Sequence, residues 1–432
     1  MASSQADIVS LWQETAPPST KPLRFTGSGQ ADVAVIGGGY TGLSTAHALA
    51  REGVDVVVLE ANRLGWGASG RNGGVVSGKF RIGFAQMARR WGLDVAKRMH
   101  EIGLEAIDNI PDLLAEFEID AEYQPSGSLR CAHRPEALAA LHEECDWLGH
   151  ALGDRSVSML DASQMAFEIG ATGFCGGMLN QHGGVIHPLK FHRGLAAGLR
   201  AGGLAIYDES PVTGIEHLPR GGLNLHLPQG KIRVQQAVLA TNAYSSLTAA
   251  GGTIRRRVVP FRSAIIATAP LTGTVGSTLL AEGRSYTETR RMMRWFRKSG
   301  DRLLFGGRGA FGKKNSASGF VALEKAMRRQ FPQLEGLEIT HRWSGLVAMT
   351  MDSLPHIGRL DDRLTYAMGY NGTGVAMASY VGRHTAAMVL NQPVDLGLIN
   401  GLALRNVPFY PAREIGVRLI AGWYQTLDAF GK

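Results

Sequence analysis

The chain has 432 residues, 44% of them hydrophobic, which is enough apolar material for two or three domain-sized cores. No stretch approaches the roughly 18 apolar residues of a membrane span. Residues 1–14 lack the pattern of a secretory signal. Three cysteines without metal-ligand spacing predict buried thiols in a reducing, cytoplasmic compartment. The net charge of +8 indicates an arginine-rich surface; attraction of nucleic acid is the alternative, but no basic groove interleaved with aromatic residues accompanies the charge, and no nucleic-acid partner is expected.

The N-terminal part of the chain predicts a strand–helix–strand unit. Residues 1–30 contain Pro17 and Pro18 and predict an extended arm rather than a helix. Residues 31–36 are a continuous apolar run, which suits a strand buried on both faces of a parallel sheet. A glycine-rich turn, a helix over 43–52 and a second strand over 54–60 follow.

The rest of the chain alternates helical and strand-like patterns without an internal repeat. We expect helices over 94–114 and 135–149, a second βα-like segment from 183 to about 202, a strand at 204–207, a hairpin of 223–227 with 231–239, several antiparallel strands within 255–310, and helices over 323–330 and from 374 to about 390.

The turn carries the first chemical signal, Gly37-x-Gly39-x-x-Gly42. Gly37 permits the tight turn, Gly39 lets the backbone approach a pyrophosphate, and Gly42 lets the helix pack close to the strand. Glu60 ends the second strand about 20 residues later, where a carboxylate can bind a ribose diol. A glycine-rich turn in an unrelated sheet is the alternative, but the strand, helix and acid around it favour a dinucleotide site.

Further segments decide which dinucleotide is expected. These are Ser10–Trp12 with its proline-rich arm, the glycine- and serine-rich loop 61–74, and residues 241–244, 351–358 and 370–375. As a set they resemble the D-amino acid oxidase-like superfamily of FAD-dependent oxidoreductases, in the γ-glutamylputrescine oxidase-like branch. The resemblance implies a Rossmann-type FAD-binding domain (1–88, 159–250 and 340–432) and an α+β substrate domain with an antiparallel sheet (89–158 and 251–339).

The resemblance also implies which residues contact FAD. The loop 68–74 would offer backbone N–H groups to the flavin, Val212 would contact the adenine, and the helix start at 372–375 would face the pyrimidine end of the flavin. The expected contacts are Gly37, Gly39, Tyr40, Thr41, Gly42, Glu60, Ala61, Arg63, Gly67, Ala68, Ser69, Arg71, Asn72, Gly73, Gly74, Val212, Thr241, Asn242, Gly345, Gly372, Thr373, Gly374 and Val375.

Departures from the family pattern refine the expected activity. Loop 68–74 has no His and segment 344–358 has no Cys, so we predict non-covalent FAD. Val347 follows Leu346 where glycine-oxidase-like relatives place a carboxylate-binding Arg, which favours an amine over a plain α-amino acid, although another arginine could supply that fork. Leu304 aligns with the oxygen-activating Lys of sarcosine oxidases, so O2 or another electron acceptor both remain open.

The expected reaction is hydride transfer from a small amine to the flavin, followed by hydrolysis of the imine. Candidate pocket walls are Trp66, Phe261, Tyr286, Trp295 and Trp343, each with a structural role as the alternative. His187 and His356 could act as acid–base groups, but structural hydrogen bonding is favoured. An amino acid oxidase or dehydrogenase, an RNA-modifying flavoprotein and a non-enzymatic dinucleotide-binding protein remain alternatives, and the chain is expected to be a monomer or homodimer without metal.

Overall fold

The computed structural model describes residues 9–252, 254–308, 317–413, 415–416 and 419. Its first sheet is parallel at its centre and has antiparallel strands at its margins. The order is β17 (His356–Arg359), β18 (Leu364–Met368), β11 (Gly230–Leu239), β1 (Gly27–Ile36), β2 (Val56–Leu59) and β8 (Ala205–Tyr207), with β10 (Leu223–Leu227) and β9 (Gly214–His217) continuing from β11.

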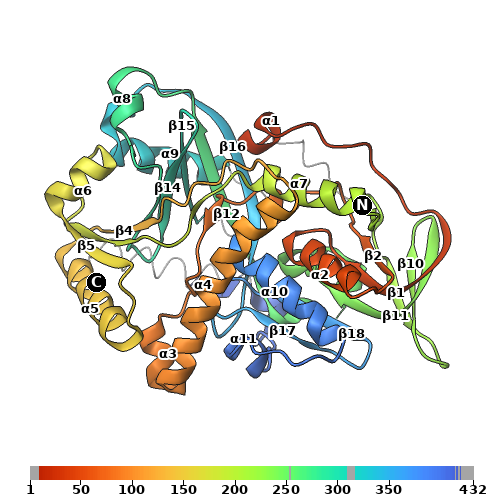
Figure 1. Ribbon diagram of the computed structural model, residues 1–432. Coiled ribbons are helices and arrows are strands. Elements are labelled where there is room, and N and C mark those ends of the chain that lie inside the picture. The colour runs from red at the N-terminus through yellow and green to blue at the C-terminus, as the bar shows by residue number, and fades with distance from the viewer. Residues whose placement is uncertain (1–8, 253, 309–316, 414, 417–418, 420–432) are drawn as a thin grey trace.

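Both faces of this sheet are covered, as the apolar run of β1 predicts. Val33 and Val35 pack into a core with helices α2 (Tyr40–Arg51), α4 (Leu93–Glu116), α7 (Pro188–Ala201) and α10 (Gly374–Val389), whereas Ala34 and Ile36 face the β9–β10–β11 side. Figure 1 shows α2, α10 and α4 side by side over the first face. The carboxyl ends of β1 and β2 therefore point toward the N-terminus of α2, where a parallel sheet places its ligand.

The second sheet is antiparallel except where β13 runs parallel to β4. Its order is β16 (Ile339–Met349), β12 (Val259–Thr268), β15 (Arg302–Arg308), β14 (Arg294–Ser299), β13 (Ser285–Glu288), β4 (Ser128–Ala132), β6 (Gly176–Asn180) and β5 (Val157–Asp161), and a two-stranded sheet pairs β3 (Val75–Val76) with β7 (Gly184–Val185). Around these lie helices α5 (Pro135–Trp147), α6 (Ala162–Ile169), α8 (Gly273–Thr278) and α9 (Ala317–Gln330), whereas α3 (Phe84–Trp91) packs against α4 and α11 (Leu398–Gly401) packs against β17 of the first sheet. The expected combination of a Rossmann-type sheet and an antiparallel sheet is confirmed.

Sheet membership differs from the predicted ranges at three places. β6 and most of β5 fall within 159–250 but pair in the second sheet, and β16 likewise pairs with β12 although it lies almost wholly within 340–432. Helix α4, which was predicted for the substrate domain, packs against α10 in the core of the first sheet. Hydrophobic periodicity predicted α4 but not the strands β5, β6 and β16, and it carries no information about which partner an element packs against.

The predicted extended arm contains one short helix. Residues 1–8 lie outside the described residues, but α1 spans Leu11–Thr15 and begins with a capping box in which Ser10 and Gln13 satisfy each other's backbone N–H groups. Leu11 and Trp12 are fully buried, so this segment is anchored rather than extended. The prediction from Pro17 and Pro18 was correct in excluding a long helix, but it missed the short helix α1 that ends before them.

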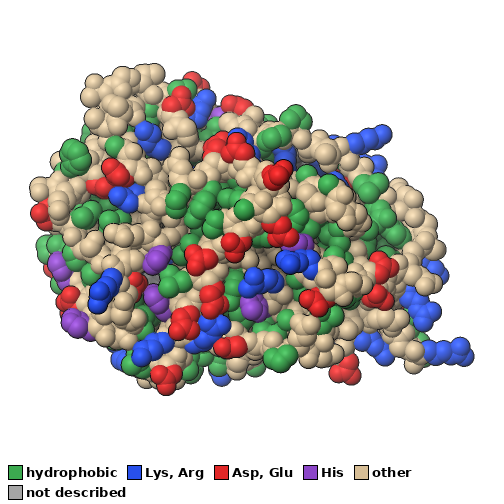
Figure 2. All heavy atoms as spheres, viewed as in Figure 1, with side chains coloured by type: hydrophobic (Ala, Val, Ile, Leu, Met, Phe, Trp, Pro, Cys, Tyr) green, Lys and Arg blue, Asp and Glu red, His purple; other side chains and the backbone are tan. Residues whose placement is uncertain are grey.

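Surface charge and helix composition are the features that concern nucleic acid and membranes as partners. On the face drawn in Figure 2, Lys and Arg side chains are interspersed with Asp and Glu, and no continuous patch of cations covers it. No described helix is long and apolar enough to cross a lipid bilayer.

Candidate functional site

The turn after β1 is shaped by its three glycines. Gly37 has a φ of +112°, in the region that glycine favours, and a Cβ there would meet the Ala240 carbonyl at 2.8 Å. A Cβ on Gly42 would lie 1.8 Å from the Gly37 oxygen, so the start of α2 and the end of β1 touch only because Gly42 has no side chain. Gly39 is the N-cap of α2 and lines a cavity. The turn and the positive end of the helix thus form an anion site.

Glu60 lies beside this turn with its carboxylate fixed by backbone. Its Oε2 accepts a hydrogen bond from the Gly38 N–H at 2.8 Å, and its Oε1 accepts one from the Asn62 N–H at 2.9 Å. Burial raises the pKa of Glu60, and these N–H groups act in the opposite direction. Each carboxylate oxygen keeps a second lone pair for a ligand hydroxyl, as ribose recognition requires.

The loop after Glu60 is held from behind by three buried donors. The indole N–H of Trp343 donates to the Arg71 carbonyl at 3.0 Å, that of Trp12 to the Asn72 carbonyl at 2.9 Å, and Nε of Arg297 to the Gly73 carbonyl at 2.7 Å. Three consecutive carbonyls therefore point away from the cavity that Arg71, Asn72 and Gly73 line. Because a peptide N–H points opposite to its carbonyl, this arrangement turns the N–H of Gly73 toward the cavity.

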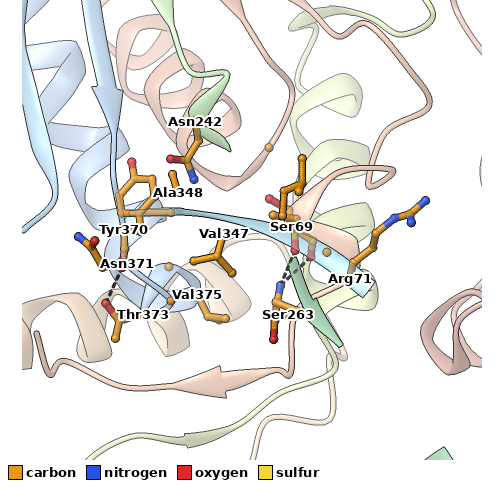
Figure 3. Close-up of a pocket in the computed structure, with 18 of the residues that line it drawn as sticks. Ser69, Arg71, Asn242, Ser263, Val347, Ala348, Tyr370, Asn371, Thr373 and Val375 are labelled. Carbon is orange, nitrogen blue, oxygen red and sulfur yellow. Dashed lines mark hydrogen bonds between the residues drawn. The ribbon is translucent and has the colours of Figure 1, made fainter. Parts of the chain in front are cut away.

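Two asparagine side chains order the opposite wall by accepting hydrogen bonds from backbone N–H groups. Asn371 accepts a hydrogen bond from the Thr350 N–H at 2.9 Å, and Asn242 accepts one from the Gly369 N–H at 2.9 Å. Figure 3 shows Val347, Ala348, Tyr370, Asn371, Thr373 and Val375 gathered on one side, opposite Ser69 and Arg71. The N-terminus of α10, which begins at Gly374, joins this wall. The site thus receives two helix N-termini, from α2 and α10.

A cavity of about 1610 Å³ connects all these features. It exceeds the roughly 300–1,000 Å³ of a pocket for one drug-sized ligand, so it has room for a dinucleotide and a small substrate. The predicted contacts that line it are Gly37, Gly39, Tyr40, Thr41, Glu60, Ala61, Gly67, Ala68, Ser69, Arg71, Asn72, Gly73, Val212, Thr241, Asn242, Gly345, Gly372, Thr373, Gly374 and Val375. The turn, the acid and the bare N–H groups fit FAD.

Three predicted cofactor residues do not reach the cavity wall among the described residues. Gly42 lies beneath the turn, where it allows the close approach of α2. The Arg63 guanidinium lies 3.4 Å from the Glu209 carboxylate, and the Gly74 N–H bonds to the Asn72 side chain. Arg63 and Gly74 thus have partners within the protein, and their contact with the cofactor stays a prediction.

Two of the five predicted pocket aromatics are core residues instead. Trp66, Phe261 and Trp295 line the cavity, whereas Tyr286 and Trp343 are absent from the described lining. Tyr286 is fully buried and stacks on Phe296 with a centroid distance of 5.4 Å. Trp343 is fully buried behind the loop, where it donates to Arg71. Trp343 directly precedes the lining residues Ser344 and Gly345, yet its own side chain is buried away from the cavity, so its neighbours in sequence did not determine where it lies.

The two histidines that were considered as acid–base groups have structural partners. His187 caps α7 by accepting the Lys190 N–H at 3.2 Å, and its Nε2 lies 2.9 Å from the Thr15 hydroxyl; burial lowers its pKa to about 4. His356 lies 3.0 Å from the Asp352 carboxylate. Neither is found in the described cavity lining, which agrees with the structural role that the sequence favoured.

The cavity also contains residues that sequence reasoning missed. Segment 79–84, which follows β3, lines it, together with Arg130 and Glu144 at one end and Arg262 beside Ser344. The only sequence signal for segment 79–84 is that it begins a few residues after the glycine-rich loop 61–74. Arg130 and Glu144 lie on β4 and α5, and nothing in their local pattern connects them to the cofactor loop.

Comparisons with known proteins agree with this geometry. The FAD dependent oxidoreductase family matches residues 32–388. Gamma-glutamylputrescine oxidoreductase of Escherichia coli is 31% identical over 88% of this chain and 87% of its own, and a probable oxidoreductase OrdL of Rhizobium meliloti is 32% identical over 97% of each. The structure of glycine oxidase from Geobacillus kaustophilus superimposes with a TM-score of 0.72 over 87% of this chain and 99% of that chain, at 22% identity.

Proposed function

This chain belongs to the FAD dependent oxidoreductase family, and on that premise we propose that it oxidises the C–N bond of a small N-substituted or γ-glutamylated amine. The observation that carries the proposal is one continuous cavity that joins the glycine turn, Glu60 and loop 65–73 to the aromatic residues Phe261 and Trp295 of the second sheet. When bound, FAD accepts the hydride that leaves the substrate α-carbon, water hydrolyses the resulting imine to an aldehyde, and H2O2 forms if O2 is the acceptor.

We propose that FAD binds without a covalent link. No cysteine is among the described residues that line the cavity. His192 does line it, but its Nε2 lies 2.7 Å from the Gly38 carbonyl, which places this ring at the phosphate turn rather than beside loop 71–73. Burial lowers the pKa of His192 to about 4, so the ring is neutral at pH 7.

The shape and polarity of the wall support an amine substrate. Val347 lines the cavity on β16 with an apolar side chain, and Ile265 and Trp295 face the cavity from β12 and β14. A free alkylamine has a pKa near 10.4, and only the neutral form carries the lone pair that drives hydride loss. Apolar walls disfavour the ammonium and so favour the reactive form.

An amino acid oxidase is the second candidate, and one observation favours it. Arg262 donates to the Ser344 hydroxyl at 3.0 Å, and Arg71 lies 3.4 Å from the Ser344 carbonyl, so two guanidinium groups approach the cavity at the middle of β16. Such a pair could bind the carboxylate of an α-amino acid even though position 347 is valine.

The test is anaerobic reduction of the purified holoenzyme, followed at the flavin absorbance. We expect bleaching by N-substituted or γ-glutamylated amines and a rise of kcat/KM between pH 7 and about pH 10, because the fraction of neutral amine grows over that range. A flat pH profile would contradict amine deprotonation, and faster reduction by glycine or sarcosine than by any amine would favour the second candidate. Reduction by dithionite is the control for intact flavin.

A further inference from the structure

Lys79 is a cavity residue whose ammonium has no hydrogen-bond acceptor or carboxylate partner among the described residues. It is partly buried and lines the same cavity as the flavin loop. The preceding Gly78 touches Gly103 of α4 so closely that a Cβ on Gly78 would lie 2.1 Å from the Gly103 oxygen. This backbone contact seats the segment against α4 and leaves the Lys79 side chain on the cavity side.

The second sheet places Arg130 on the cavity wall near Lys79. Trp295, Thr287 and Arg130 occupy paired positions on the adjacent strands β14, β13 and β4, and all three line the cavity. Trp295 marks the flavin end, because a Cβ on Gly73 would lie 2.5 Å from its ring. Two strand spacings separate Trp295 from Arg130, which is about 10 Å.

The charges at this end of the cavity are not balanced. Arg130 pairs with the Glu144 carboxylate at 2.5 Å, which leaves Lys79 as the excess positive charge of the three. Burial and the neighbouring Arg130 lower the pKa of Lys79 to about 8, while Glu144 acts in the opposite direction. A partly buried ammonium that has no carboxylate within hydrogen-bond distance among the described residues is poorly compensated, and an anionic ligand group would supply the missing partner.

We propose that Lys79, supported by Arg130, forms a subsite for a carboxylate that the substrate carries about 10 Å from the nitrogen it presents to the flavin. The inference rests on the proposed function and narrows its substrate class to amines with a remote anionic group. Since three backbone bonds span about 3.3–3.6 Å, that separation corresponds to roughly nine bonds of extended chain. Thr287, which lies between Trp295 and Arg130 on the sheet and lines the cavity, then faces the intervening chain.

Matched substrates test the subsite. N-Succinylputrescine carries a carboxylate nine bonds from its free amine, and N-acetylputrescine has the same amine and amide without the charge. We expect Lys79→Met to raise KM for N-succinylputrescine at least tenfold, with kcat nearly unchanged, and to leave KM for N-acetylputrescine within twofold. Lys79→Arg should retain most of the preference, and Lys97→Met, at an exposed position of α4, should behave as wild type. Equal KM changes for both substrates would overturn the proposal.

A binding measurement separates this inference from the proposed reaction. N-Butylsuccinamate has the carboxylate and chain but no amine, so it binds without being oxidised. By calorimetry on the holoenzyme we expect its Kd to rise at least tenfold in Lys79→Met, with flavin content and melting temperature as checks on folding. Lys79-dependent binding without reduction by either putrescine derivative would refute amine oxidation and leave the subsite standing. Binding that is absent, or equal in wild type and Lys79→Met, would refute the subsite.

Discussion

At the scale of single residues, the orientation of three peptide groups depends on side chains from distant parts of the chain. Trp12, Trp343 and Arg297 each donate one hydrogen bond to consecutive carbonyls of residues 71–73. Arg297 is itself buried, and its pKa is lowered to about 9 by burial. These groups do not line the cavity among the described residues, so they act on a cofactor only through the loop they orient.

Trp12→Phe is the prediction for this arrangement. Phenylalanine retains the apolar packing but leaves the buried Asn72 carbonyl without its donor, which costs about 1–3 kcal/mol. We expect FAD affinity to fall roughly 5- to 150-fold, from the same cost, and the visible flavin spectrum to shift. Equilibrium dialysis and absorbance spectra measure both effects. Trp147→Phe, a partly buried tryptophan away from the cavity, is the matched control, and equal effects in the two variants would contradict a specific role for Trp12.

At the scale of elements, the close approach of α2 to β1 is what creates the phosphate turn. A methyl group added at Gly42 would meet the backbone oxygen of Gly37. Because that oxygen is not part of a side chain, no rotamer change can relieve the clash. The helix and the strand would have to separate, which moves the N-terminus of α2 away from the anion site.

Gly42→Ala is therefore predicted to be destabilising although alanine is the better helix former. We expect the free energy of unfolding to fall by roughly 1–3 kcal/mol and FAD uptake to be impaired, as measured by urea denaturation and by flavin content after purification. Gly401→Ala is the control, because a Cβ at that helical position meets nothing within 4 Å. Its stability should be unchanged or up to about 1 kcal/mol higher, and an equal loss in both variants would refute the argument.

At the scale of the whole molecule, buried neutral histidines make stability depend on pH. Burial lowers the pKa of both His192 and His187 to about 4, against 6.5 for an unperturbed ring. Between these values the unfolded chain binds more protons than the folded chain, so the free energy of unfolding falls as pH decreases.

The predicted outcome is a urea midpoint that is lower at pH 5 than at pH 7, with a loss on the order of 2 kcal/mol for each fully buried histidine. His192→Gln should flatten this slope, because glutamine can still donate to the Gly38 carbonyl and does not titrate. A matched slope in His192→Gln and wild type would show that other groups cause the dependence. His142→Gln, at an exposed position, should leave the slope unchanged.

The sequence alone determined the local features of this protein. The apolar run of β1, the spacing of Gly37, Gly39 and Gly42, and the position of Glu60 follow from backbone sterics and from periods of two and 3.6 residues, which a short window contains. The family resemblance extended this to FAD and to the class of reaction. Contact of each predicted residue with FAD stays a prediction, although most of them line one cavity.

Only the tertiary structure decided which distant side chains meet at the site. Trp12 and Asn72 are 60 residues apart and Trp343 and Arg71 are 272 apart, and no local pattern relates them. The same holds for Lys79 and Arg130, which become neighbours because β13 pairs with β4 and Gly78 packs on Gly103. Strand pairing and packing depend on the sum of many long-range contacts. For this reason these side chains form a site only in the folded chain, and no short stretch of sequence predicts it.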